Sequence, residues 1–255
     1  MIKNRKMKAA VFMGKEKLEV REVDVPEITE EEALIRVKFA GICGTDIHIF
    51  AGKHPRVKAP LIMGHEFSGE IAKIETKRRK DFKKGNRVVA EPLISCGECF
   101  ACKSGFAHVC QKLGLYGIDK DGAFAQYVKI PVDKLFKIPL NINFDVAALI
   151  EPIAVAVHAV RTSSLKMGDI VCVQGGGPIG LLTALVAKLS GSANVIICEK
   201  QPFRIKLAKG FGLQVIDVND KDPVAEILKL TRGRGADVVF EAAGFPPTVL
   251  LSPKL

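Results

Sequence analysis

DIVCVQGGGPIG, residues 169–180, is the stretch of the sequence that decides the fold. Its first six residues are largely apolar, a run of glycines follows, and the apolar LLTALVAKL continues with the periodicity of a helix. The order of strand, glycine turn and helix predicts a nucleotide-binding βαβ unit, with a G-x-G-x-x-G turn. We expect Gly175 to form the tight turn, Gly177 to let a pyrophosphate approach the backbone, and Gly180 to pack the helix against the strand. The helix N-terminus would then face the phosphates.

The next predicted strand ends in an acid at the position where dinucleotide-binding proteins use one. The segment NVIIC leads into Glu199, nineteen residues after Gly180. A carboxylate there accepts hydrogen bonds from both ribose hydroxyls and repels a 2′-phosphate, so the sequence favours NAD over NADP. Arg204 argues in the other direction, because an arginine near this position can accommodate the 2′-phosphate.

The segments on either side of this unit predict two domains of different architecture. The downstream pattern alternates between apolar strands (214–219 and 236–244) and a helix (about 223–230), which is typical of a doubly wound parallel sheet. The first 150 residues instead contain short alternating segments between Gly, Pro and charged turns, which indicates an antiparallel, barrel-like domain. We therefore predict an α/β protein with domains at 1–150 and 151–255. The alternating segments are KAAVF, LEVREV, ALIRVKFAG, FSGEIAKIE, NRVVAE and FAQYVKIP.

Four of the seven cysteines fall within one short loop, CGECFACKSGFAHVC, with the spacing C-x2-C-x2-C-x7-C. In a reducing compartment such spacing lets a loop fold around one tetrahedral ion, while a disulfide would not persist. An iron–sulfur cluster is the competing interpretation, and we favour zinc. Four thiolates leave no open coordination position, so this ion would stabilise a lobe at about 91–112. The predicted ligands are Cys96, Cys99, Cys102 and Cys110.

A second group of potential metal ligands is dispersed along the chain. Cys43 lies in GICGTDIHIF, His65 and Glu66 follow 22 and 23 residues later, and Glu151 lies in LIEP. Cysteine, histidine and carboxylate are the ligands of catalytic zinc sites, in which three protein ligands hold the ion and a fourth position stays open. Each residue alone would be interpreted as structural, so the prediction depends on their combination. Cys172 and Cys198, within apolar strands, are predicted to be buried without a ligand role.

The composition is that of an ordinary α/β protein, with 255 residues, 48% hydrophobic and 26% charged. The start of the sequence lacks a signal peptide's apolar core and no apolar run is long enough to span a membrane, so we expect a cytoplasmic protein. The net charge of +10 and the basic run at 77–84 raise the question of nucleic acid. That run lies between two alternating segments without interleaved aromatic residues, so we expect a solvated hairpin connection and no nucleic-acid partner.

With these motifs identified, residues 7–249 resemble the zinc-dependent medium-chain dehydrogenases, in particular the sorbitol, butanediol and threonine dehydrogenase branch. The resemblance implies a GroES-like N-terminal domain joined to a Rossmann domain, and hydride transfer between an alcohol or polyol and NAD. It implies a catalytic zinc on Cys43, His65 and Glu66, with Glu151 as an alternate ligand or a partner of the substrate. The four clustered cysteines match the structural-zinc lobe.

The resemblance also implies a proton relay and a set of cofactor contacts. Thr45 and His48 match positions that pass the hydroxyl proton toward solvent, a task that suits a hydroxyl and an imidazole. The residues that match the NAD contacts are Gly175, Gly177, Ile179, Gly180, Glu199 and Arg204.

The chain also departs from that family's pattern, because it stops at 248–255, where the family continues into further strands. We therefore expect an incomplete Rossmann sheet of order 3-2-1-4, with the strand at 236–243 as an open edge. The alternative to an active enzyme is a truncated, catalytically impaired remnant that binds zinc strongly and NAD weakly. A zinc-free reductase is disfavoured, because it would have no use for Cys43. Relatives in this branch form homo-oligomers, and the motifs do not select one alcohol over another.

Overall fold

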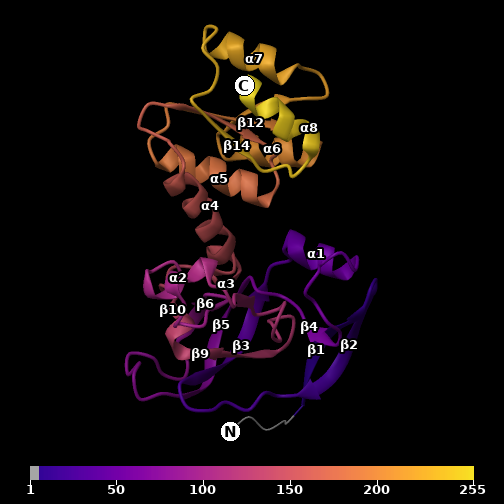
Figure 1. Ribbon diagram of the computed structural model, residues 1–255, viewed down its shortest axis with the longest axis vertical. Helices are drawn as coiled ribbons and strands as arrows, with labels where there is room; N and C mark the ends of the chain where they lie inside the picture. The colour runs from indigo at the N-terminus through magenta and orange to yellow at the C-terminus, as the bar shows by residue number, and fades with distance from the viewer. Residues whose placement is uncertain (1–5) are drawn as a thin grey trace. The chain divides into compact units, whose positions relative to one another are not determined.

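The computed structural model describes residues 6–255, which fold into two compact units. The first unit ends at Glu151 and the second runs from Pro152 to Leu255 (Figure 1). Among the described residues, no helix combines the length and apolar character that crossing a membrane requires.

Antiparallel strands form most of the first unit, in agreement with the alternating sequence pattern. A three-stranded sheet has the order β2-β1-β4, a five-stranded sheet has the order β10-β6-β5-β3-β9, and β7 pairs with β8. A bridge between Ala9 and Ala125 joins β1 to the segment that leads into β9, and the five-stranded sheet packs against an apolar core of its own. The strands are β1 (Lys6–Gly14), β2 (Lys17–Asp24), β3 (Glu32–Ala40), β4 (Leu61–Ile62), β5 (Phe67–Glu75), β6 (Arg87–Ala90), β7 (Leu93–Ile94), β8 (Gly114–Leu115), β9 (Tyr127–Pro131) and β10 (Leu135–Lys137).

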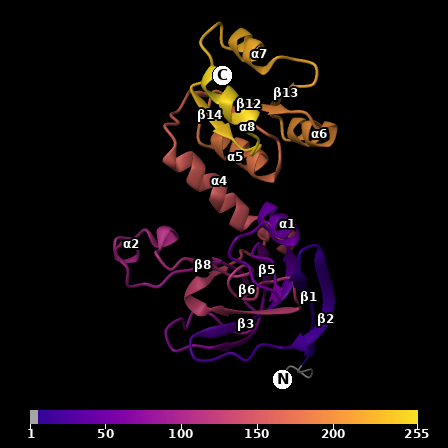
Figure 2. The same cartoon turned by 45° about the vertical axis from the view of Figure 1, so that its right-hand side comes forward.

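The first unit also contains short helices, a cysteine-rich lobe and a basic connection between two strands. The cysteine-rich lobe contains α2 and extends outward from the sheets (Figure 2). The basic run at 77–84 connects the antiparallel strands β5 and β6, as predicted, and two of its cations pair with Asp81 and Glu30. The helices are α1 (Gly44–Phe50), α2 (Phe100–Lys103), α3 (Phe144–Ala147) and the 3₁₀ turns η1 (Ala107–Val109) and η2 (Val132–Lys134).

The second unit is a parallel sheet of order β13-β12-β11-β14, the 3-2-1-4 order expected from the sequence. Helix α4 (Ile150–Thr162) crosses from the first unit into the second. The strands are β11 (Ile170–Gln174), β12 (Asn194–Glu199), β13 (Gln214–Asp217) and β14 (Val238–Glu241). The remaining helices are α5 (Pro178–Leu189), α6 (Pro202–Gly210), α7 (Pro223–Leu230), α8 (Pro246–Leu251) and the turn η3 (Ser252–Lys254).

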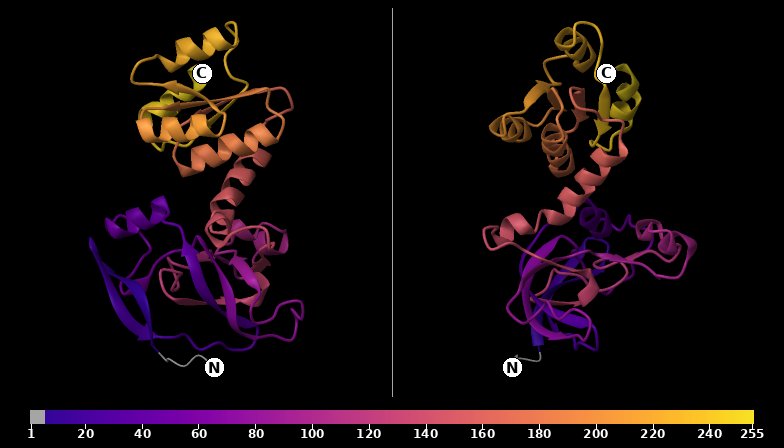
Figure 3. Two further views of the ribbon diagram at one scale, coloured as in Figure 1. Left: turned by 180° about the vertical axis from the view of Figure 1, so that it is seen from behind. Right: turned by 90° about the vertical axis from the view of Figure 1, so that its left-hand side faces the viewer.

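Helices cover both faces of this sheet (Figure 3), which explains why its strands are continuously apolar. Val171 and Val173 pack with α5 on one face, while Cys172 points to the other face and packs with α7 and Leu255. Cys172 and Cys198 are both buried, as predicted. Within the described residues β14 is an edge of the sheet, and Phe245, Val249 and Leu250 around α8 are exposed.

Candidate functional site

Cys43 is held at the start of α1 by a local hydrogen-bonded turn. It is the N-cap residue of the helix, with an extended backbone, and its N–H donates to Oδ2 of Asp46 at 2.8 Å. The N–H of Asp46 in turn donates to the carbonyl of Cys43 at 3.0 Å. This reciprocal capping fixes the backbone of Cys43 relative to the helix.

His65 and Glu66 lie in the segment that enters β5, and two glycines make room for them. Gly64 has φ +91°, and a side chain there would collide with the ring of Phe124 at 2.4 Å. A side chain at Gly41 would lie 2.3 Å from the Glu66 carboxylate. These glycines therefore let two polar residues occupy a buried position, where His65 is 4% and Glu66 9% exposed.

The structure brings the thiol of Cys43, the imidazole of His65 and the carboxylate of Glu66 together. One ligand atom from each lies within 4.8 Å of the other two. Burial raises the pKa of Cys43 and of Glu66, and Nδ1 of His65 is buried without a hydrogen-bond partner. Burying a thiol, a carboxyl and an unpartnered imidazole nitrogen side by side is costly, so the cluster fits a cation. A sulfur, nitrogen and oxygen donor set of three residues fits an open zinc site.

Glu151, in the first turn of α4, belongs to the same environment. Burial raises the pKa of its carboxyl; the charge of His65 lowers it, and the charge of Glu66 raises it further. The Glu151 carboxylate therefore interacts electrostatically with two of the three clustered residues, although its oxygens lie outside the group of atoms that share the 4.8 Å limit.

Asp46 is a site residue that sequence reasoning missed. It is 2% exposed, and its Oδ1 has no hydrogen-bond partner. Burial raises its pKa, while hydrogen bonds from the backbone and the charge of His65 act in the opposite direction. An acid beside a ligand histidine orients the imidazole and increases its basicity. The signal in the sequence was its place three residues after Cys43, the spacing of a capping acid.

The two residues of the expected proton relay have different surroundings. Thr45 forms hydrogen bonds with Cys43, which lower the pKa of that thiol against the larger effect of burial. His48 is exposed on α1, and its carbonyl accepts from the N–H of Lys53 at 2.9 Å. No hydrogen bond joins the side chains of Thr45 and His48 within residues 6–255 as described, so their participation in one relay stays a prediction.

The four clustered cysteines converge on one point in their lobe. Their sulfur atoms are separated by 3.4 Å (Cys96 to Cys110), 3.5 Å (Cys99 to Cys102) and 3.9 Å (Cys96 to Cys102, Cys99 to Cys110). A tetrahedral ion with metal–sulfur bonds of about 2.3 Å places its sulfurs about 3.8 Å apart. These separations fit such an ion and are far longer than a disulfide bond of about 2.05 Å.

Backbone N–H groups point at the same sulfurs. The N–H groups of Cys96 and Lys112 both donate to Sγ of Cys110 at 3.3 Å. Hydrogen bonds with backbone N–H groups lower the pKa of Cys99 to about 6, while burial and the neighbouring thiols raise the pKa of Cys102 to about 12. The loop thus stabilises negative charge on sulfur, which a thiolate metal site requires.

In the second unit, the glycine turn has the geometry of a phosphate-binding loop. Gly175 has φ +94°, and a side chain there would lie 2.9 Å from the backbone of Ala243. A side chain at Gly180 would lie 1.9 Å from the Gly175 carbonyl, so both positions require glycine for the fold. Gly177, the N-cap of α5, has only the guanidinium of Arg204 near it, at 3.7 Å, which leaves its surface open to a ligand.

Glu199, at the end of β12, is held by this turn. Its Oε2 accepts from the N–H of Gly176 at 2.8 Å, and its Oε1 accepts from the N–H groups of the two following residues. Arg204 lies 3.6 Å from the carboxylate. Burial acts to raise the pKa of Glu199, but the three N–H donors and the guanidinium outweigh it and leave the pKa below its ordinary value. Ile179 is partly exposed in the first turn of α5.

Comparison with known proteins gives matches over most of the chain. Residues 29–140 match the family described as Alcohol dehydrogenase GroES-like domain, and residues 178–255 match the family described as Zinc-binding dehydrogenase. An L-threonine 3-dehydrogenase from Bacillus licheniformis is 43% identical over 237 residues, which make up 91% of this chain and 68% of that enzyme. A sorbitol dehydrogenase from Bacillus subtilis is 38% identical over 94% of this chain and 69% of that enzyme.

Solved structures agree with these matches. A putative zinc-binding dehydrogenase from Sinorhizobium meliloti, bound to NADP, has a TM-score of 0.93 and 36% identity over 99% of this chain and 74% of that one. The 2R,3R-butanediol dehydrogenase of Bacillus subtilis has a TM-score of 0.88 and 34% identity over 97% of this chain and 74% of that one. The chain therefore spans about two thirds of the length of its curated relatives. By sequence, fold and motif, it belongs to the zinc-dependent medium-chain dehydrogenases, oxidoreductases that act on alcohols and polyols.

Proposed function

We propose that this chain oxidises a secondary alcohol or polyol with NAD at a zinc ion held by Cys43, His65 and Glu66, and that a second zinc stabilises the four-cysteine lobe. The observation that carries the proposal is the convergence of three different ligand types within 4.8 Å in a buried position. Burial raises the pKa of the Cys43 thiol and of the Glu66 carboxyl, because it makes their negative forms costly. A zinc ion bound between them would compensate this cost and would be the catalytic metal.

Zinc in such a site would act as a Lewis acid that lowers the pKa of the substrate hydroxyl. NAD, held by the glycine turn at 175–180 and by Glu199, would supply the hydride acceptor for the carbinol carbon, while the hydroxyl proton would leave for solvent. Thr45, hydrogen-bonded to Cys43, would accept that proton, and the exposed His48 imidazole would release it. Glu151 supplies a carboxylate that exchanges with substrate or supports it.

The choice of NAD rests on Glu199. Its buried carboxylate has a lowered pKa and is ionised at neutral pH, so it would accept ribose hydroxyls and repel a 2′-phosphate. Arg204, 3.6 Å away, is partly neutralised by that carboxylate. The relative from Sinorhizobium meliloti that is bound to NADP makes this a point to measure.

The names of the relatives suggest a class of substrate. Threonine, sorbitol and 2,3-butanediol each carry a secondary hydroxyl next to a second polar group. We infer that a vicinal hydroxyl or amino group assists binding here as well.

The test is NADH or NADPH formation, followed by absorbance, over a panel of L-threonine, sorbitol and 2R,3R-butanediol. Turnover with NAD on one of these, lost in Cys43→Ala and retained in Cys172→Ala, supports the proposal. Cys172 is a matched control because it is a buried cysteine far along the chain from the ligands. Zinc binding without turnover on any panel member would instead favour a catalytically impaired protein.

A further inference from the structure

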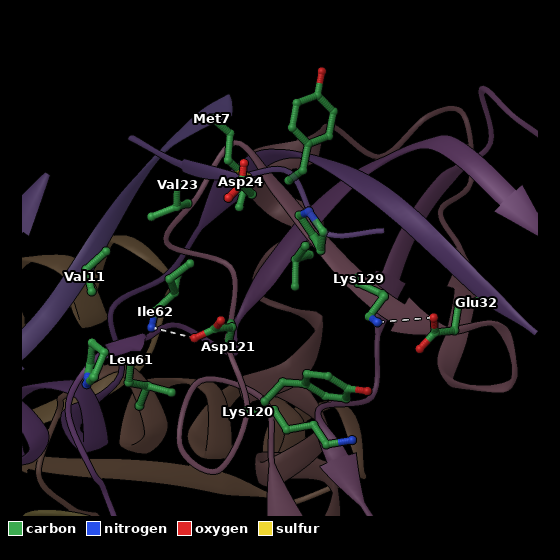
Figure 4. Close-up of a pocket in the computed structure, with 16 residues that line it drawn as sticks. Met7, Val11, Val23, Asp24, Glu32, Leu61, Ile62, Lys120, Asp121 and Lys129 are labelled. Carbon is green, nitrogen blue, oxygen red and sulfur yellow. Dashed lines mark hydrogen bonds and ion pairs between the residues drawn. The ribbon is translucent and has the colours of Figure 1, made fainter. Parts of the chain in front are cut away.

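A cavity lies in the first unit, and none of the metal-site residues lines it. Its volume is about 570 Å³, within the range of small-molecule pockets, which is roughly 300–1,000 Å³. It opens between β1, β2, β4 and β9 and the connection at 116–122 (Figure 4). Its lining contains neither Cys43, His65, Glu66 and Glu151 nor the cysteine lobe.

One side of this cavity is apolar and mostly buried. Met7 and Val11 from β1, with Leu61 and Ile62 from β4, lie on the same side in Figure 4, next to Val23. These side chains suit an apolar ring or a short hydrocarbon chain.

The charges around the cavity are unevenly paired. Each of its acids has a donor: Asp24 pairs with Lys6 at 2.9 Å, Glu32 with Lys129 at 3.4 Å, and Asp121 accepts from the N–H of Ile62 at 2.9 Å. Lys120 is the lining cation that has no acidic partner among the described residues. Tyr116 adds a hydroxyl whose pKa is raised to about 12 by burial and nearby acids.

We propose that this cavity binds a small monoanionic amphiphile, an apolar ring or short chain that carries one carboxylate or sulfonate. The apolar part occupies the side formed by β1 and β4, and the anionic group pairs with Lys120. A ligand with a second negative charge would meet the three acids, so one charge is preferred.

The cavity is connected to the strand that precedes His65 and Glu66. The N–H of Gly122 donates to the carbonyl of Ile62 at 2.7 Å, and the N–H of Ala123 donates to that of Gly64 at 2.8 Å. A side chain at Gly122 would lie 2.1 Å from the Gly64 carbonyl, so the two segments are in direct backbone contact. A ligand that displaces Leu61 or Ile62 would therefore also displace the segment that carries His65 and Glu66. This coupling rests on the proposed zinc site.

The sequence provides a built-in reporter of binding. The chain has no tryptophan and two tyrosines, and both Tyr116 and Tyr127 line the cavity. The experiment is titration of the zinc-loaded full chain with 8-anilinonaphthalene-1-sulfonate, with excitation of tyrosine and detection of probe emission. We expect saturable binding of one probe with energy transfer from tyrosine, unaffected by saturating NAD.

Two variants and two matched controls locate the probe. Lys120→Gln should weaken binding about threefold to fivefold, the effect of one exposed ion pair. Val23→Phe should fill the cavity and abolish saturable binding. Lys84→Gln, in the β5–β6 connection, and Val20→Phe, an exposed position on the same strand as Val23, should bind like the wild type. Wild-type binding by Lys120→Gln and Val23→Phe, or the absence of tyrosine transfer, would overturn the proposal.

The coupling has a separate readout. With the probe bound, the rate at which a chelator removes zinc from the Cys43, His65 and Glu66 site should change by at least twofold. Val23→Phe should remove this effect of the probe. Probe binding with unchanged zinc release would refute the coupling while leaving the binding site intact. Absence of any zinc at the Cys43 cluster would instead refute the proposed function, which is a distinguishable failure.

Discussion

The backbone N–H of Cys43 and Oδ2 of Asp46 form a 2.8 Å hydrogen bond across the first turn of α1. This bond ties the residue that supplies the thiol ligand to the buried acid that interacts with His65. One buried side chain thus caps the helix at one proposed zinc ligand and interacts electrostatically with a second. The geometry of the metal site depends on α1 as much as on β5.

Asp46→Asn should weaken zinc binding at the Cys43 cluster by about 10- to 100-fold, because supporting acids of ligand histidines have effects of that size. The measurement is competition for zinc with a chelator of known affinity. Asp220→Asn, an exposed acid in the second unit, is the matched control and should retain wild-type affinity. Equal zinc affinities for the two variants would show that Asp46 acts only as a helix cap.

Ser68 and Arg87 should act as positioning residues for Glu151. The buried Ser68 hydroxyl donates to the carbonyl of Phe144, and Arg87 donates to the carbonyls of Leu140 and Ile142 and stacks on the Phe144 ring. Both therefore hold the segment that leads through α3 to Glu151. Ser68→Ala should cost about 0.5–1.5 kcal/mol of unfolding free energy, the net contribution of one hydrogen bond, because the Phe144 carbonyl still accepts from the N–H of Ala148 at 3.0 Å.

A double-mutant cycle separates this positioning role from general stability. If Arg87 acts through Glu151, Arg87→Lys should reduce turnover in the wild type and have little further effect in a Glu151→Gln background. Additive losses in the two backgrounds would indicate a purely structural role for Arg87.

Gly177 and Gly180 should respond differently to alanine. Gly180→Ala places a methyl group 1.9 Å from the Gly175 carbonyl, so we expect a loss of about 1–3 kcal/mol in stability together with the loss of NAD binding. Gly177→Ala meets only Arg204 at 3.7 Å, so its melting temperature should stay close to wild type while its NADH affinity falls about tenfold. Thermal denaturation and NADH fluorescence titration measure the two effects. Wild-type NADH binding by Gly177→Ala would contradict the proposed pyrophosphate contact.

The lowered pKa of Glu199 predicts a pH dependence of stability. A carboxyl whose folded pKa lies below its ordinary value of 4.5 stabilises the protein above that value, and this contribution is lost as the pH falls through the folded pKa. Chemical denaturation at a series of pH values from about 7 to 3.5 should therefore show a decline that is shallower in Glu199→Gln than in the wild type. Parallel curves would argue against an ionised, hydrogen-bonded carboxylate.

The sequence predicted the elements that have strong periodicity. β1, β2, β3, β5, β6 and β9 follow the alternating segments, and the parallel strands follow the continuous apolar runs. The two-residue strands β4, β7 and β8 are too short to leave a pattern. Helix α1 was not predicted, because its seven residues carry no apolar stripe of sufficient length.

The ligand clusters were predicted by residue type and combination, while their supporting residues were not. Asp46 and His65 are nineteen residues apart, and Ser68 and Phe144 are 76 apart, so nothing local in the sequence marks their interactions. The same holds for the cavity near Tyr116, which is lined by residues from distant parts of the chain.

The most direct test of the central claim is the number of zinc ions per chain, measured by native mass spectrometry on the purified protein and two variants. The wild type should carry two ions. Cys43→Ala should carry one and lose dehydrogenase turnover, and Cys96→Ser should carry one and lose stability of the lobe. A single ion in the wild type, or two ions retained in Cys43→Ala, would contradict the assignment of a catalytic zinc to Cys43, His65 and Glu66.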